Sequence, residues 1–173
     1  MTEEFLHLFD RVPLVDQHAA RCMAKVVKAD MRQIVLPDNL KAIGSQVFSS
    51  LAFVKELFLP NSVQTIRRGA FLGWFGIEEL SSQLRVIPEH AFEICTIKHL
   101  DIPEAVLFVR ERAFYLCRCL EWVRFNGRPV SIAEDAFDEC TSLSRITVME
   151  GDVPYFRTIL PKRLHSILKE VGS

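Results

Sequence analysis

The side chains best suited to metal binding or nucleophilic catalysis in this sequence are its five cysteines and five histidines. They are Cys22, Cys95, Cys117, Cys119 and Cys140, and His7, His18, His90, His99 and His165. Metal sites use closely paired ligands such as C-x-x-C, and only Cys117 and Cys119 come near that spacing. A catalytic thiol or hydroxyl needs a neighbouring base and an orienting acid, and no motif of that kind surrounds any histidine. We therefore expect no metal, no cofactor and no enzymatic activity.

Composition narrows the class of protein further. Hydrophobic residues make up 49% of the 173 residues and charged residues 25%, which predicts one folded globular domain. The formal net charge is −1, so no basic field favours nucleic acid as a partner. The seven glycines form no cluster that could hold a phosphate group, so nucleotide binding is not expected either.

The N-terminal residues and the cysteine count both bear on the compartment. Residues 1–17, MTEEFLHLFDRVPLVDQ, begin with acidic side chains and mix apolar with polar ones, unlike a signal peptide. No stretch approaches the ~18 apolar residues that a membrane-spanning helix requires. An odd number of cysteines without an export signal favours free thiols in a reducing compartment. We therefore expect an intracellular, cytoplasmic protein without a membrane partner.

A repeat organises the elements that must position these side chains. Its clearest column is Phe48, Phe71, Phe92, Phe114 and Phe137, with steps of 23, 21, 22 and 23 residues (71−48, 92−71, 114−92, 137−114). A second column consists of segments of the type L-x-L, which begin at Ile34, Leu57, Leu80, Leu100, Val123 and Ile146. A third column lies five residues before each phenylalanine and contains Ile43, Ile66, Ile87, Val109 and Ile132. Three columns with one period indicate a repeat protein.

The cysteines belong to this repeat. Cys95, Cys117 and Cys140 each follow the phenylalanine by three residues, and Leu51 and Trp74 take the same position in the first two units. A column that accepts Cys, Leu and Trp is typical of a buried apolar position. Core packing is therefore favoured over a metal site or a catalytic thiol.

The physical meaning of the repeat is a solenoid with one turn of chain per unit. The L-x-L alternation is that of a short strand, and strands of successive turns are expected to stack in parallel. Pro37, Pro60 and Pro103 follow three of these strands and end them. We predict a right-handed coil with a parallel β-sheet on one face. The third unit, over residues 80–92, is short and lacks the proline, so the coil is expected to be pinched there.

These units resemble the BspA-like leucine-rich repeats found in bacterial surface antigens and in expanded protist families. The resemblance covers about residues 31–150, some five units plus a final strand, and is close in residues 57–63 (LFLPNSV) and 132–137 (IAEDAF). It implies a leucine-rich-repeat fold and a role in adhesion or protein interaction.

Short helical caps are expected at both ends, because a solenoid exposes its core there. The predicted caps are residues 1–30 and 151–173. In the second, a helix is expected to begin at Pro161 and to bury an apolar stripe of Leu164, Ile167, Leu168 and Val171. The alternative is that a terminal helix docks a partner. Residues 12–16 (VPLVD) resemble a fragment of an F-box, the segment that recruits substrate adaptors to a ubiquitin ligase.

The outward-facing residues of the strands form the usual binding surface of a solenoid. By alternation they are Gln33 and Val35, Glu56 and Phe58, Glu79 and Ser81, His99 and Asp101, Trp122 and Arg124, and Arg145 and Thr147. The predicted partner-binding residues are Glu56, Phe58, Glu79, His99, Asp101, Trp122, Arg124 and Arg145. Phe58 and Trp122 are expected to be anchors, and the acidic and basic ends of this face are expected to orient the partner.

The sequence as a whole predicts a non-catalytic protein-interaction module or scaffold that binds a partner protein through this strand face. Two alternatives remain open at this point. One is a structural subunit of a larger assembly, and the other is an F-box-like substrate adaptor that uses its N-terminal helices.

Overall fold

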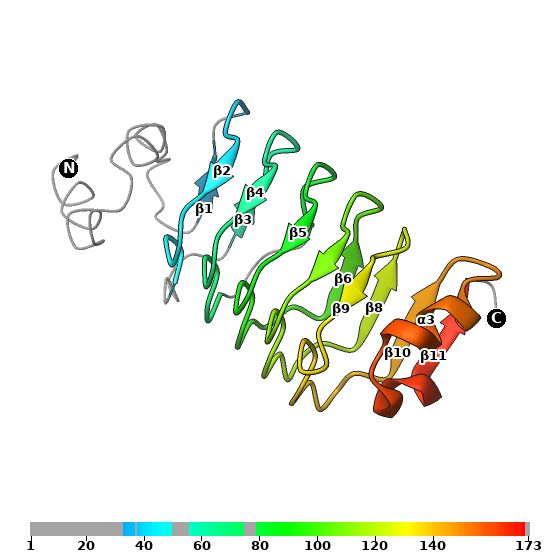
Figure 1. The fold of residues 1–173 in the computed structure, drawn as a ribbon. Coiled ribbons are helices and arrows are strands. Elements are labelled where there is room, and N and C mark those ends of the chain that lie inside the picture. The colour runs from blue at the N-terminus through cyan, green and yellow to red at the C-terminus, as the bar shows by residue number, and fades with distance from the viewer. Residues whose placement is uncertain (1–32, 37, 50–55, 75–78, 172–173) are drawn as a thin grey trace, which may run out of the picture.

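The computed structural model describes residues 33–36, 38–49, 56–74 and 79–171, and only the backbone of residues 33–35, 56 and 58. The described chain winds into an elongated coil whose successive turns lie side by side from β1 to β11 (Figure 1). The predicted N-terminal cap, residues 1–30, lies outside the described residues, as does the F-box-like fragment within it.

One face of the coil carries parallel strands, five of them at predicted L-x-L segments and a sixth, β11, at a segment that was predicted to be helical. They are β1 (Gln33–Val35), β3 (Glu56–Phe58), β6 (His99–Ile102), β8 (Trp122–Phe125), β10 (Arg145–Val148) and β11 (Leu168–Glu170). β1 pairs with β3, and β6, β8, β10 and β11 form a four-stranded sheet, which we call the main sheet. Its register follows the repeat, with Leu100 opposite Val123, Val123 opposite Ile146, and Ile146 opposite Leu168. Five of the six predicted strands are thereby confirmed, and all their pairings are parallel.

The third predicted strand, at Leu80, does not form, and that prediction was wrong. Ser81, predicted to face outward, is fully buried, and its hydroxyl donates a hydrogen bond to the carbonyl oxygen of Val63 at 2.6 Å. The unit from Leu80 to Leu100 spans 20 residues (100−80), against 23 for the next one (123−100). We attribute the missing strand to this shorter unit, which places Ser81 in the core. There its side-chain hydroxyl makes the hydrogen bond that a backbone amide would make in a strand ladder.

A second set of parallel strands lies along the coil and was not predicted. Its members are β2 (Ala42–Ile43), β4 (Thr65–Ile66), β5 (Val86–Ile87), β7 (Phe108–Val109) and β9 (Ser131–Ile132). Each ends on a residue of the third repeat column, and that residue is buried while its predecessor is exposed or half-buried. These strands form two groups, β2–β4 and β5–β7–β9.

A proline accounts for one of the hydrogen bonds that are missing where the second set is interrupted between β4 and β5. After the other strands, the amides of Arg67, Arg110 and Ala133 donate to the carbonyl oxygens of Ile43, Ile87 and Val109 at 3.0, 2.9 and 2.9 Å. Pro88 occupies the corresponding position after β5 and has no N–H to donate. Both sheets are therefore broken at the same turn of the coil.

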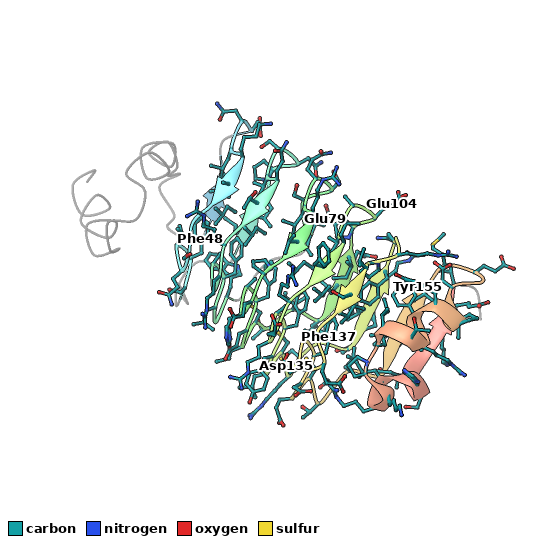
Figure 2. The ribbon with its side chains drawn as sticks, viewed as in Figure 1. Phe48, Glu79, Glu104, Asp135, Phe137 and Tyr155 are labelled. Carbon is teal, nitrogen blue, oxygen red and sulfur yellow. The ribbon has the colours of Figure 1, made fainter. Side chains whose placement is uncertain are left out.

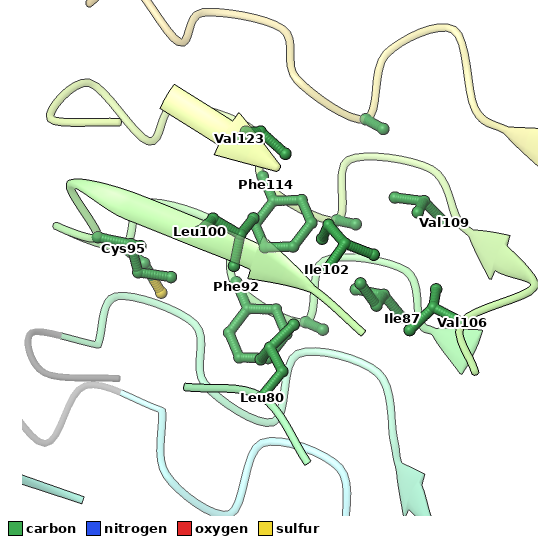
Figure 3. Close-up of a cluster of buried hydrophobic side chains, with 14 of the residues drawn as sticks. Leu80, Ile87, Phe92, Cys95, Leu100, Ile102, Val106, Val109, Phe114 and Val123 are labelled. Atoms are coloured by element: carbon green, nitrogen blue, oxygen red, sulfur yellow. The ribbon is translucent and has the colours of Figure 1, made fainter. Parts of the chain in front are cut away.

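The phenylalanine column forms the centre of the core, as predicted. The rings of Phe48, Phe71, Phe92, Phe114 and Phe137 are 0–3% exposed. Neighbouring rings are stacked, with centroids 5.2–5.4 Å apart and planes within 10° of parallel. Figure 3 shows Phe92 and Phe114 within the cluster formed by the strand and third-column side chains, and Figure 2 labels Phe48 and Phe137 at the two ends of the column. This continuous stack holds one turn against the next.

The C-terminal segment differs from the single helix predicted from Pro161 onward. It consists of α3 (Val153–Ile159), a 3-10 helix η1 (Lys162–Ile167) and then β11. Leu164 and Leu168 are buried as predicted, Ile167 is partly buried, and Val171 is exposed, which contradicts its predicted burial. Leu168 lies in a strand, because residues 168–170 pair with β10. Leu168 follows Ile146 by 22 residues (168−146), one repeat period, so β11 continues the main sheet by one more turn.

Helix α3 packs against the last regular turn of the coil (Figure 1). Phe156 is fully buried, and its ring centroid lies 5.0 Å from that of Phe125. Tyr155, labelled in Figure 2, donates its hydroxyl to the carbonyl oxygen of Pro129 at 2.7 Å. The nearly buried carboxylate of Asp152 accepts a hydrogen bond from Arg128 Nε at 2.8 Å. Within the described residues, no helix has the length and apolar character needed to cross a bilayer.

Candidate functional site

The repeated cysteines are core residues hydrogen-bonded to the turn before them. The thiols of Cys95, Cys117 and Cys140 donate to the carbonyl oxygens of Phe71, Phe92 and Phe114 at 3.1, 3.0 and 3.1 Å. Burial raises the pKa of Cys95 to about 12, and the neighbouring Cys140 side chain together with burial raises the pKa of Cys117. Thiols with raised pKa values, here Cys95 and Cys117, are poor nucleophiles at neutral pH. The pKa of Cys140 is instead lowered, chiefly by the neighbouring Cys117 side chain. The described cysteines are free, and of these Cys119 is exposed.

This column gives a first testable prediction, on stability. We expect Cys117→Ser to lower the free energy of unfolding by about 1–3 kcal/mol, because a buried hydroxyl is costlier to desolvate than a thiol even if it keeps a bond to Phe92. Cys119→Ser is the matched control and is expected to change stability by less than about 0.5 kcal/mol, since that side chain is exposed. Urea unfolding measures both. Equal losses would contradict the assignment of Cys117 to the core.

The described histidines contact carboxylates or the backbone. His90 contacts Glu93 and lies 3.3 Å from Glu89, His99 Nε2 lies 3.7 Å from Glu121, and the ring of His165 is 3.0 Å from the carbonyl oxygen of Leu160. In the part of the chain that the structure describes, no group of three or more His, Cys, Asp or Glu side chains is placed to hold a metal ion.

A polar cleft of about 490 Å³ lies where the second set of strands is interrupted. Residues of β4 and β5 line it, together with Gln64, Gln83 and Arg85. None of the predicted partner-binding residues contributes to it. The cleft is thus separate from the strand face.

The main sheet brings most of the predicted partner-binding residues into two rows. His99, Trp122 and Arg145 face one another across β6, β8 and β10, and Asp101, Arg124 and Thr147 form the next row. Glu79 is exposed but precedes the distorted segment of the third turn. The side chains of Glu56 and Phe58 lie outside the described part of β3. Their role, including that of Phe58 as an anchor, stays a prediction.

Trp122 and His99 form an aromatic pair on this face. Val123 and Phe125 are fully buried, so strand alternation turns Trp122 and Arg124 outward, where both are half-buried. The Trp122 ring stacks on the His99 ring, with centroids 4.7 Å apart and planes 15° from parallel. The sequence spacing of 23 residues (122−99) could have predicted this contact, because residues one repeat period apart lie side by side on neighbouring strands.

The same face carries three cationic side chains. Arg124 and Arg145 were predicted, whereas Lys169 was missed because its segment was assigned to a helix. Lys169 lies opposite Thr147 on β11 and is exposed, as is Arg145. Arg124 is half-buried, and its Nε is covered and has no hydrogen-bond partner among the described residues. The face therefore combines an aromatic pair with neighbouring positive charge.

Comparisons with known proteins agree with the repeat. A family model described as "BspA type Leucine rich repeat region" matches residues 27–143 in six copies. The fold is similar to the crystal structure of a leucine-rich cell surface protein from Faecalibacterium prausnitzii A2-165, with a TM-score of 0.66 and 30% sequence identity. The match covers 75% of this chain and 35% of that protein, so the chain spans about a third of its relative's length. A search of curated proteins gave no match.

Proposed function

Because the chain belongs to the BspA-type leucine-rich repeat family, we propose that it is a non-catalytic interaction module that binds a partner protein through the strand face of its main sheet. Solenoids of stacked repeats present extended surfaces of this kind, and their partners lie across several turns. The partner-binding residues of this proposal with described side chains are Glu79, His99, Asp101, Trp122, Arg124 and Arg145.

The observation that carries the proposal is the position of Trp122. An indole ring contributes most to stability when it is fully buried, as Trp74 is. Trp122 is instead half-buried on an outward strand position, among polar and charged neighbours. Large aromatic side chains in such positions are typical anchors of protein interfaces. The charged residues around it would contribute orientation and selectivity more than affinity.

Three finer features belong to the same proposal. We propose that the coil is right-handed, that the terminal segments cap it, and that the protein acts inside the cell. The burial of Phe156 against Phe125 supports a capping role for the C-terminal segment. The free cysteines among the described residues support a reducing compartment. Fractionation of the source cells would test the location.

The test of the proposed surface is the substitution Trp122→Ala. We expect it to reduce binding to the natural partner by at least ~2 kcal/mol, about thirtyfold, while the melting temperature changes little. Pull-down with quantitative mass spectrometry from the source cells measures partner recovery, and thermal melting measures the fold.

Thr147→Ala, on the same face but with a small side chain lost, is the matched control and is expected to leave partner recovery unchanged. Unchanged recovery with Trp122→Ala would rule out the strand face. A collapse of the melting temperature would mean that the ring is needed for the fold and would remove the main support for the proposal.

A further inference from the structure

The C-terminal half of the strand face concentrates unpaired positive charge. Arg124, Arg145 and Lys169 project from the adjacent strands β8, β10 and β11, and neighbouring strands lie ~4.8 Å apart. None of the three takes part in an ion pair among the described residues. The carboxylates of Asp101 and Glu121, on or beside β6 and β8, leave this group with a net positive charge.

Other arginines on the coil are neutralised by the neighbouring turn. Arg112 pairs with Asp135, with 3.6 Å between Nε and Oδ2, and Arg163 contacts both Glu134 and Asp138. The repeat thus places carboxylates opposite arginines at several positions away from the strand face. On the strand face, Arg124 lies between Asp101 on β6, with which it forms no ion pair, and the uncharged Thr147 on β10.

Of these three cations, Arg124 would be stabilised most by a bound anion. It is half-buried, its Nε is covered, and that atom has no hydrogen-bond partner in the described structure. The Arg124 guanidinium has lost some hydration and forms no ion pair with its cross-strand neighbour Asp101, so its electrostatic interaction with a bound carboxylate is less screened than at a fully exposed site. Arginine binds carboxylates through two parallel hydrogen bonds, so this group favours a planar anion.

The aromatic pair of Trp122 and His99 would contact a second part of the ligand. His99 covers one side of the Trp122 ring, and no cation–π contact to Trp122 occurs among the described residues. Its neighbour across the strand on the other side is Arg145. A planar or apolar side chain of a ligand would pack against this ring while its carboxylates reach the two arginines.

Resting on the proposed function, we infer that this half of the face binds an acidic polypeptide segment in which glutamate or aspartate residues flank an aromatic side chain. The carboxylates pair with Arg124 and Arg145, with Lys169 adding attraction at the edge, and the aromatic side chain lies on Trp122. The charge complementarity of the face selects this partner over a basic one.

The experiment uses the full chain and a short peptide of glutamates with two phenylalanines, together with a counterpart in which lysines replace the glutamates. Neither contains tryptophan, so intrinsic fluorescence reports the protein, and of its two tryptophans Trp74 is fully buried while Trp122 is partly exposed. We expect the acidic peptide to change the Trp122 emission, with an affinity that falls as salt is raised. The basic peptide is expected to leave the emission unchanged.

The variant Arg124→Glu, Arg145→Glu is expected to weaken binding of the acidic peptide at least about tenfold. The matched control is Arg67→Glu, Arg157→Glu, which makes the same change in net charge at exposed positions away from this face and is expected to bind as the unmodified protein does. Calorimetry provides the affinities, and melting curves verify that each variant folds.

Three outcomes would overturn the inference. They are no response to the acidic peptide, equal losses in the two double variants, and equal affinity for a single-stranded oligonucleotide of the same charge. If the basic peptide alone changes Trp122 emission, the acidic partner is wrong while the proposed binding surface stands. If Trp122→Ala also leaves natural-partner recovery unchanged, the proposed function fails as well.

Discussion

Replacing Phe114 by alanine is expected to lower the free energy of unfolding by about 3–5 kcal/mol. The ring is fully buried and stacks on Phe92 and Phe137 at centroid distances of 5.4 and 5.2 Å, so its removal leaves a cavity between three turns. In a repeat protein each turn is stabilised chiefly by its neighbours, so a cavity here also uncouples the turns on either side. Urea unfolding followed by circular dichroism measures the loss.

Phe108→Ala is the control for that variant. Phe108 lies in β7 on the second set of strands, is half-buried and carries the guanidinium of Arg110 at 4.7 Å from its ring centroid. Its removal is expected to cost only about 1 kcal/mol, because less apolar area returns to water. A loss for Phe114→Ala no larger than this would show that the stacked column does not hold the turns together.

The second large effect is expected for Phe156→Ala, again about 3–5 kcal/mol. Phe156 is the one residue of α3 that is fully buried, and it packs on Phe125 in β8. Without the ring, α3 loses its main apolar contact and the last turn becomes accessible to water. We therefore expect residues 151–171 to become sensitive to proteolysis well below the unfolding temperature of the remaining turns.

Tyr155→Phe separates loss of packing from loss of a hydrogen bond in the same helix. It removes only the hydroxyl that donates to Pro129, so we expect a cost of about 1 kcal/mol and no increase in proteolysis. Simultaneous unfolding of the whole coil in Phe156→Ala, without early cleavage of the C-terminal segment, would contradict the assigned role of the ring.

The sequence predicted those parts of the fold that recur with the repeat. The phenylalanine column and the L-x-L strands recur at each turn, so their burial and parallel pairing follow from periodicity alone. The second set of strands was missed because each strand has two residues, too few to show alternation. Ser81 was placed outward by alternation, which fails where the unit is three residues shorter than the next (23−20).

The C-terminal error arose from two competing periods. Leu164 and Leu168 are four residues apart and fit one face of a helix, yet Leu168 also follows Ile146 by one repeat period. Backbone pairing with β10 prevails, because it satisfies the edge of the sheet. The same error hid Lys169 from the predicted binding surface, whereas Trp122 and Arg124 were found because β8 belongs to a regular turn.

The interruption of both sheets at the third turn has a mechanical consequence. Between the second and third turns neither strand ladder is intact, and the turns are joined by the chain around Phe71 and Phe92 and by Ser81 and Ser82, which hydrogen-bond to Val63 and Asn61. We therefore expect the coil to bend most easily at this turn. A partner that contacts the coil on both sides of it would fix the angle between the two parts.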